Sequence, residues 1–339
     1  MTLDKITLED QIMTESAKRA GALLTINLDA IVANWRLLNA KVAPASRCAA
    51  VVKADAYGLG SAPVTSALYA AGCRRFVVAT LDEGLFLRPS LADAEIFILS
   101  GPFAGCERDF VAADLTPVLN SPEQIARWQA TAHQSGRPLP SVLHVDTGMS
   151  RLGLNLRETQ VLAEDKRTLT AIQPILLMSH LACADIASHP LNHQQLSAFQ
   201  AARAHFPGLP GSLAASSGIF LGPDWHADWC RPGAALYGLR PTMEGPNPLH
   251  PVVRLDCRII QVRDIDAGES VGYGATHRAS RPGKLATVAA GYADGLFRTL
   301  GNRGYGHLGK HRVPLVGRVS MDLIIFDVTD LPEGLAAPG

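Results

Sequence analysis

The sequence predicts an α/β protein: an eight-stranded parallel β/α (TIM-type) barrel followed by a smaller, mostly antiparallel β domain. Three observations support this fold class. The 339 residues are enough for one large core and a smaller one. Residues 25–232 alternate short apolar runs with longer amphipathic stretches, as in parallel strands joined by helices. After the Pro- and Gly-rich residues 240–251, apolar runs follow one another with turns and no long helical pattern.

Eight apolar or β-branched runs predict the barrel strands. Helical segments separate them, for example residues 29–43 and residues 121–134, where Ser-Pro-Glu is a typical helix start. An open doubly wound sheet is the alternative, but no G-x-G-x-x-G follows the first strand. The predicted strands are residues 48–53, 76–80, 95–100, 116–119, 142–146, 175–180, 212–216 and 229–231.

The predicted β domain begins near residue 241. Its expected strands are residues 252–262, 285–290, 312–316 and 323–328. The domain organisation is therefore an N-terminal extension (1–20), a β/α barrel (21–240) and a β domain (241–339).

Composition excludes several partners. The chain has 31 Lys+Arg and 31 Asp+Glu and hence no net charge, so neither nucleic acid nor a membrane surface is an expected partner. No apolar run approaches the roughly 18 residues of a membrane span, and residues 1–20 contain no apolar signal core, so we expect a cytoplasmic protein.

Six scattered cysteines without a C-x-x-C pair indicate reduced thiols. We expect no metal site, since His189 and His193 are separated by a proline and lack the Glu of a metalloprotease motif.

Polar residues occur where five of the predicted barrel strands end. The carboxyl ends of barrel strands gather at one rim, where barrel enzymes have their active sites. Each residue alone has an ordinary explanation, such as a surface lysine or a hydrogen-bonded core histidine. Together they predict one active site, formed by Lys53, Asp146, His180, Ser216 and Arg231.

These residue types fit pyridoxal phosphate. A lysine at the mouth of an apolar strand is partly desolvated, so its amine is available for a Schiff base with an aldehyde. Ser216, Ser217 and Gly218 follow the seventh strand at a predicted helix start, which favours a phosphate. Arg231 is able to face the pyridine nitrogen of the cofactor and, because arginine keeps its proton, would hold that nitrogen unprotonated.

From about residue 23 onward the sequence resembles the alanine racemases, which are pyridoxal-phosphate enzymes. The string VVKADAYG (51–58) is similar to the family's cofactor-lysine motif, which implies that Lys53 binds the cofactor covalently and Tyr57 its phosphate. DTGMSRLG (146–153) is similar to the segment whose arginine, here Arg151, contacts the cofactor and the substrate carboxylate. RPGAALYG (231–238) resembles the motif of the pyridine-nitrogen arginine, which adds Gly233 and Tyr237 to the cofactor site.

The resemblance continues in the predicted β domain. VGYGA (271–275) resembles the stretch with the second catalytic base, here Tyr273, which would reach the site from the other subunit of a C₂ homodimer. His180 and Arg231 would support that phenol as it loses its proton. GYADG (291–295) and SMD (320–322) resemble substrate-binding segments, which implies substrate contacts from Tyr292, Met321 and Asp322.

Several positions depart from the family pattern. Leu59 stands where many members have His, and Ala215 where the phosphate loop usually has Asn. His144 replaces a carbamylated lysine that braces the equivalent of Arg151 in some members. The family's β domain continues for several strands, so this one is expected to be C-terminally truncated.

The resemblance implies the interconversion of L-alanine and D-alanine. A racemase of broader amino-acid preference and a non-catalytic pyridoxal-phosphate-binding protein are alternatives. A decarboxylase would share Lys53 but favours an acidic group, and not Arg231, at the pyridine nitrogen. The sequence leaves open whether D-alanine is made for the cell wall or degraded.

Overall fold

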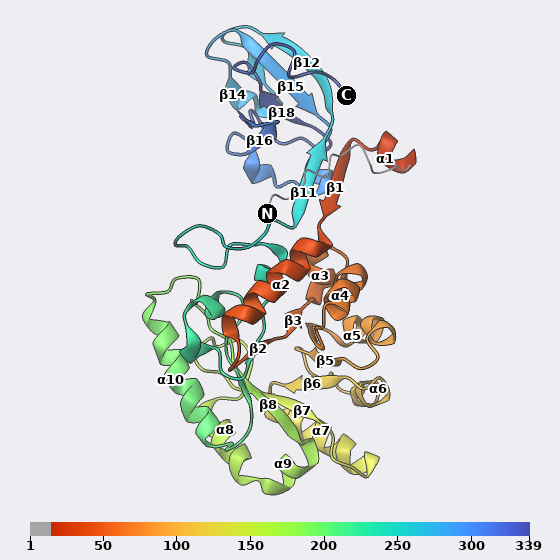
Figure 1. Ribbon diagram of the computed structural model, residues 1–339, viewed down its shortest axis with the longest axis vertical. Coiled ribbons are helices and arrows are strands. Elements are labelled where there is room, and N and C mark those ends of the chain that lie inside the picture. The colour runs from red at the N-terminus through yellow and green to blue at the C-terminus, as the bar shows by residue number, and fades with distance from the viewer. Residues whose placement is uncertain (1–14) are drawn as a thin grey trace. The chain divides into compact units, whose positions relative to one another are not determined.

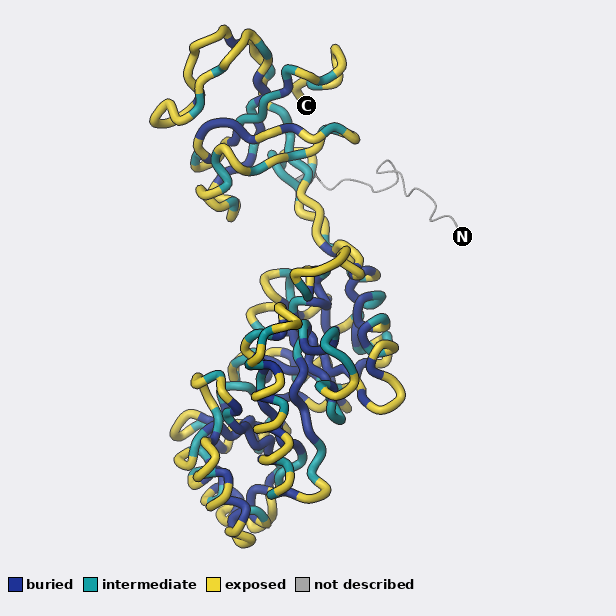
Figure 2. The backbone as a smooth tube through the Cα atoms, turned by 90° about the vertical axis from the view of Figure 1, so that its left-hand side faces the viewer, coloured by how far each residue is buried: buried dark blue, intermediate teal, exposed yellow. Residues whose placement is uncertain are grey.

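The computed structural model describes residues 15–339, which form two compact units. One consists of Ile26–Val252, and the other joins residues 15–25 to Val253–Gly339. Each unit has its own buried interior (Figure 2), formed by a separate apolar cluster, so each is described separately.

The first unit is a closed parallel barrel, which confirms the predicted fold class. Seven strands are hydrogen-bonded in chain order from β3 to β9, and β10 pairs in parallel with β2, which continues into β3 through Ala49. The Ala49 amide donates to Cys230 O (2.9 Å), and the Arg231 amide donates to Ala214 O (2.9 Å), so β10 joins both ends of the sheet. The strands are β2 (Arg47–Cys48), β3 (Ala50–Val51), β4 (Arg75–Val78), β5 (Glu95–Ile98), β6 (Thr116–Leu119), β7 (Ser141–His144), β8 (Pro174–Met178), β9 (Gly211–Ser212) and β10 (Trp229–Cys230).

Helices cover the outside of the barrel (Figure 1). Several begin at the residue types that accept hydrogen bonds from the first free amides: Asn27 before α2, Thr80 before α5 and Ser121 before α7. The helices are α2 (Leu28–Val42), α4 (Ser61–Ala70), α5 (Leu81–Leu87), α6 (Glu107–Ala112), α7 (Pro122–Ser135), α8 (Leu156–Glu164), α9 (Lys166–Ile172) and α10 (Pro190–Ala204).

Alternation along the strands divides the core into two layers. Val51, Val77, Phe97 and Val118 belong to one cluster with alternate residues of neighbouring strands, which fills the barrel interior. The residues between them pack outward against the helices. This second layer includes Phe76 and Ile96 of the strands and Phe110 and Trp128 of the helices, all almost fully buried.

The second unit is mostly antiparallel, as predicted. Strand β15 (Gly283–Val288) lies between β12 (Ile259–Ile265) and β18 (Ile324–Asp327) in a three-stranded sheet. Two further antiparallel pairs are β13 (Ser270–Val271) with β14 (His277–Arg278) and β16 (Tyr305–Leu308) with β17 (His311–Pro314). The short helix α1 (Glu15–Arg19) precedes β1 (Ala22–Ile26), which pairs with β11 (Val253–Cys257).

The predicted strand 252–262 is divided at Arg258. The amide of Arg258 donates to Gly21 O (2.8 Å) and its guanidinium to Ala20 O (3.0 Å), so residues 20–21 interrupt the run between β11 and β12. Of the expected N-terminal extension (1–20), residues 1–14 lie outside the described residues.

Residues 240–252 belong to the barrel unit, whereas the sequence placed the boundary near 240. The side chain of Asn34 on α2 holds this segment: its Nδ2 donates to His250 O (3.0 Å), and its Oδ1 accepts from the His250 amide (2.7 Å). Leu249 and Val252 are buried. No helix within residues 15–339 is long and apolar enough to cross a membrane.

Candidate active site

A cavity of 340 Å³ in the barrel unit collects most of the residues predicted from the strand ends. Asp146 is the exception, because it does not line the cavity but holds a loop beside it. Tyr237 lies directly behind Tyr57, with ring centroids 4.7 Å apart. The predicted residues that line the cavity are Lys53, Tyr57, Arg151, His180, Ser216, Arg231 and Gly233, and His144 lies among them.

Lys53 begins a left-handed turn, α3 (Lys53–Gly58), directly after the first barrel strand. The four residues from Ala54 to Tyr57 have φ between 53° and 59°, a region that costs residues with a Cβ about 1–2 kcal/mol each. Side chains and backbone groups outside the turn stabilise it. The Ala54 amide donates to Glu83 Oε1 (2.6 Å), and Asp55 Oδ1 accepts from the Ser61 amide (2.6 Å).

The turn presents Tyr57 to Gly233. A Cβ at residue 233 would overlap the Tyr57 hydroxyl, so a larger residue there would displace the Tyr57 side chain. Tyr237 donates its hydroxyl to Val51 O (3.0 Å). Burial raises the pKa of both tyrosines, so both phenols keep their protons at neutral pH.

Ser216 and nearby backbone amides form a site for an anion. Ser216 Oγ accepts from the amides of Gly233 and Ala235 (3.0 Å each), which leaves its hydrogen available for a ligand. The amides of Ser217, Gly218 and Ala234 belong to cavity-lining residues and have no partner among the described hydrogen bonds. A 3₁₀ turn, Ser217–Phe220, replaces the helix expected here. Free amides at the start of such turns favour a phosphate or carboxylate.

Arg231 is buried and stays charged. Burial lowers the pKa of its guanidinium to about 10, which still leaves it protonated at neutral pH. Its Nη2 donates to Ser179 O (2.6 Å) and its Nη1 to Ser212 Oγ. The described hydrogen bonds do not link Arg231 to His180, the other residue expected to support the second base.

Asp146 organises the loop that carries Arg151. Its Oδ1 accepts from the amides of Gly148 and Met149 (2.9 Å each), and its Oδ2 from that of Ser150 (3.1 Å). A single carboxylate therefore fixes three successive residues before Arg151. The guanidinium at its end is exposed beside the cavity.

The histidines of the cavity are uncharged. Burial, with Arg231 and Arg151 nearby, lowers the pKa of His144 to about 4 and that of His180 to about 3. Asn120 Nδ2 donates to Leu99 O and Val118 O (3.0 Å each), which turns Asn120 Oδ1 toward His144 Nδ1 (2.7 Å). The Nδ1 atom of His144 therefore carries the proton, and its Nε2 is an acceptor.

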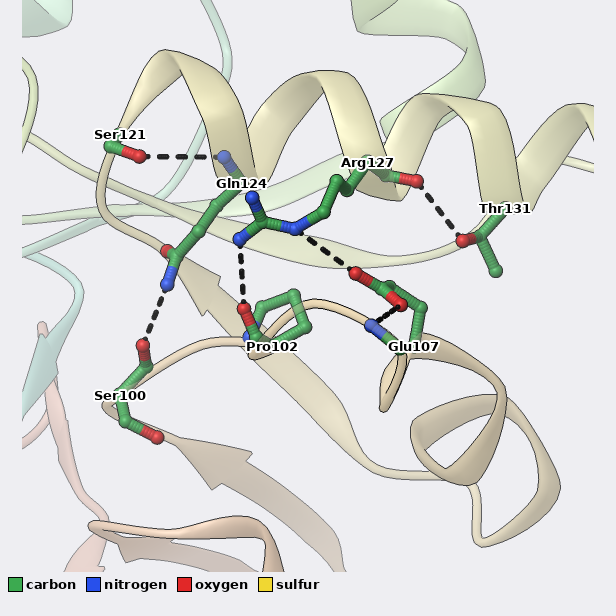
Figure 3. Close-up of polar contacts among 8 residues, drawn as sticks. Ser100, Pro102, Glu107, Ser121, Gln124, Arg127 and Thr131 are labelled. Atoms are coloured by element: carbon green, nitrogen blue, oxygen red, sulfur yellow. Dashed lines mark hydrogen bonds and ion pairs between the residues drawn. The ribbon is translucent and has the colours of Figure 1, made fainter.

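Helix α7 fixes this region from outside. Gln124 Oε1 accepts from the Asn120 amide (2.7 Å), and its Nε2 donates to Ser100 O (2.8 Å). Arg127 binds Glu107 (3.0 Å) and Pro102 O (3.1 Å), so one helix holds the loop after β5 (Figure 3).

The residues predicted in the β domain lie in the second unit. Tyr273 stands in a 3₁₀ turn, Tyr273–Ala275, and is 70% exposed. The Tyr292 amide donates to Ser320 O (3.0 Å) and the next amide, that of Ala293, to Met321 O (2.9 Å). The segments with Tyr292, Met321 and Asp322 are therefore neighbours.

Sequence reasoning missed three polar residues behind the site. Asn120 directly follows a predicted strand and was detectable by the strand-end criterion. Glu83 has a Thr-x-x-Glu signature with Thr80, which predicts a helix start but not its bond to Ala54. Gln195 on α10 donates to His180 O (2.9 Å) and accepts from the Ala182 amide (2.8 Å), contacts for which the local sequence gives no signal.

Comparison with family models finds two matches that together cover most of the described residues. Residues 26–241 match the alanine racemase N-terminal domain, and residues 252–337 match the alanine racemase C-terminal domain.

Individual proteins agree with the family models. The chain is 56% identical to an alanine racemase of Rhodospirillum rubrum over 95% of this chain and 86% of that protein. It is 50% identical to a catabolic alanine racemase of Agrobacterium fabrum over 96% of this chain and 84% of that protein. The crystal structure of alanine racemase from Bartonella henselae with covalently bound pyridoxal phosphate superimposes with a TM-score of 0.88 at 43% identity, covering 93% of this chain and 88% of that one.

Proposed function

This chain belongs to the alanine racemase family, and we propose that Lys53 and Tyr273 are the two bases with which it interconverts L-alanine and D-alanine. The enzyme is an amino-acid racemase, an isomerase that depends on pyridoxal phosphate. The observation that carries the assignment of Lys53 is the cavity in which it lies together with Ser216, Arg231 and Arg151.

The cavity fits pyridoxal phosphate. When bound, the cofactor supplies an electron sink that makes the α-hydrogen of an amino acid acidic. The Ser216 hydroxyl, with the free amides of Ser217, Gly218 and Ala234, would hold its phosphate, and the neutral phenol of Tyr57 would donate to the same group.

Two other cavity residues would hold the rest of the cofactor. The Lys53 amine would hold the aldehyde carbon covalently, with loss of one water, until the substrate amine takes its place and leaves the Lys53 amine free to act as a base. Arg231, protonated and fixed by Ser179 and Ser212, would face the ring nitrogen and donate to it. Because an arginine does not give up its proton, that nitrogen would remain unprotonated.

Arg151 would bind the substrate carboxylate. Its exposed guanidinium lines the cavity at the end of a loop that Asp146 holds rigidly. A fixed cation orients an amino acid through the group that all amino acids share, which leaves the α-hydrogen free to meet a base. Tyr292, Met321 and Asp322 are proposed as further substrate contacts.

The two bases would act from opposite sides of the α-carbon. Lys53 would remove or return the proton on one face, and Tyr273 would serve the other face. Tyr273 is exposed on its own unit and is therefore available to the active site of another subunit, which supports a homodimer with shared active sites. His180, which is neutral, and Arg231 would form the polar surroundings of the second base.

Free thiols support a cytoplasmic location. All six cysteines are unpaired, as expected in a reducing compartment.

Exchange of the substrate α-hydrogen with deuterated water tests the proposed bases. The wild-type enzyme should exchange the α-hydrogen of both alanine enantiomers, and borohydride reduction should attach the cofactor to Lys53. Lys53→Ala should lose the visible absorption of the bound cofactor. A Lys53→Ala protein that keeps this absorption, or a wild type labelled at another lysine, would exclude the assignment.

A further inference from the structure

Glu83 forms a bridge between helix α5 and the turn that begins with Lys53. Its Oε2 accepts from the amides of Ala79 (2.7 Å) and Thr80 (3.2 Å), while its Oε1 accepts from the amide of Ala54 (2.6 Å). One carboxylate therefore satisfies backbone donors from two segments more than twenty residues apart in sequence. The bond to Ala54 holds the peptide unit directly after Lys53.

This contact acts where the backbone is strained. Ala54, Asp55, Ala56 and Tyr57 all adopt left-handed φ values, although none is a glycine. Such a conformation persists only where the surroundings determine it. On the other side of Lys53, Val52 O accepts from the Ala56 amide (2.9 Å), and further along the turn Asp55 accepts from the Ser61 amide. Among the described hydrogen bonds, the one with Glu83 holds the peptide unit directly after Lys53.

We propose that Glu83 is a positioning residue for Lys53. By accepting the Ala54 hydrogen bond, it fixes the start of the left-handed turn and thereby the direction in which the Lys53 side chain leaves the backbone. Helix α5 is the anchor, since the same carboxylate caps its amino end. The inference rests on the proposed role of Lys53 as the cofactor-binding residue.

The chain offers a matched control in Glu158. Glu158 occupies the same third position of helix α8, where its carboxylate accepts from the Asn155 amide (2.9 Å) and Asn155 caps the Glu158 amide (2.9 Å). It has a capping box like that of Glu83 but no described hydrogen bond to the Lys53 turn. Removing either carboxylate should weaken one helix end to a similar extent, and only Glu83 should affect Lys53.

The experiment compares Glu83→Ala with Glu158→Ala in the full chain. For each we would measure the thermal midpoint, the dissociation constant for pyridoxal phosphate from the visible absorption band, and deuterium exchange of amides in residues 52–58 without cofactor. Glu83→Ala should weaken cofactor binding roughly tenfold and speed exchange in residues 52–58. Glu158→Ala should leave both unchanged while lowering the thermal midpoint similarly.

Glu83→Gln is the second variant, in case Glu83→Ala does not fold. It keeps the size of the side chain and one acceptor oxygen, so its cofactor affinity should lie between those of the wild type and Glu83→Ala. Unchanged affinity and exchange in both Glu83 variants, or equal effects in Glu158→Ala, would overturn the proposal. If borohydride labels no Lys53 in the wild type, the proposed function fails instead, and the exchange measurement still decides whether Glu83 holds the turn.

Discussion

Burial keeps both histidines of the cavity uncharged and leaves Arg231 protonated. His144 and His180 are held neutral, whereas Arg231 keeps its proton even when fully buried because guanidinium starts from a much higher pKa. The cavity thus combines fixed arginine cations with uncharged imidazoles. This arrangement suits a ligand with a phosphate and a carboxylate and leaves the histidines as hydrogen-bonding groups.

The depressed pKa of His144 predicts a pH-dependent stability. Its pKa falls from 6.5 in the unfolded chain to about 4 in the fold, so between these values the unfolded state binds more protons and stability falls as pH falls. Urea unfolding should show that the wild type loses more stability between pH 7 and pH 5 than His144→Gln, by on the order of 2 kcal/mol. Parallel pH profiles for the two proteins would contradict the assignment of a buried neutral imidazole.

Gly233 predicts a steric defect. The Cβ of an alanine at residue 233 would overlap the Tyr57 hydroxyl, so Gly233→Ala should push Tyr57 aside. Overpacking of this kind costs about 1–3 kcal/mol, so the dissociation constant for pyridoxal phosphate should rise at least about fivefold. Tyr57→Phe removes the overlapping hydroxyl, and the double variant should therefore lose less affinity than the two single variants combined. Strictly additive losses would show that the two residues do not interact.

At the scale of elements, the barrel strands were predictable and the turns between strand and site were not. The run 116–119 is strand β6 as predicted, because a short apolar run between turn signals has few alternatives in a barrel. The turn after Lys53 gives no such signal, since Ala and Tyr do not favour left-handed φ and a lone Asp does not predict four successive residues in that conformation. Its conformation depends on Glu83 and Ser61, contacts made only after folding.

The Asp146 loop predicts a defect in substrate binding. Asp146→Ala frees three amides and loosens the loop of Arg151, so the KM for alanine should rise about tenfold while kcat changes less. Asp165→Ala is the control, because Asp165 caps α9 through the Thr168 amide (3.0 Å). Both variants should lose about 1–2 kcal/mol of unfolding free energy. An equal KM effect in Asp165→Ala would attribute the change to general destabilisation.

At the scale of the whole molecule, the sequence predicted two domains but not which unit includes the segments at their boundaries. Residues 22–26 were expected to start the barrel and instead pair as β1 with β11, while residues 240–252 remain with the barrel through Asn34. These contacts join residues more than two hundred positions apart. Local composition carries no information about such pairings, whereas the strand-end residues were predictable because barrel geometry alone brings them together.

The proposed shared active site predicts complementation between inactive chains. Lys53→Ala and Tyr273→Phe should each lose activity about 100- to 10,000-fold, the usual cost of a missing general base. A heterodimer of the two has one site with both bases and one site with neither. Random pairing makes half the dimers heterodimers, so the mixture should recover roughly a quarter of wild-type activity. Subunit exchange, measured by native mass spectrometry on differently tagged chains, is the control. If exchange occurs and the mixture stays inactive, Tyr273 does not act across subunits, because pairing alone would then have assembled an intact site.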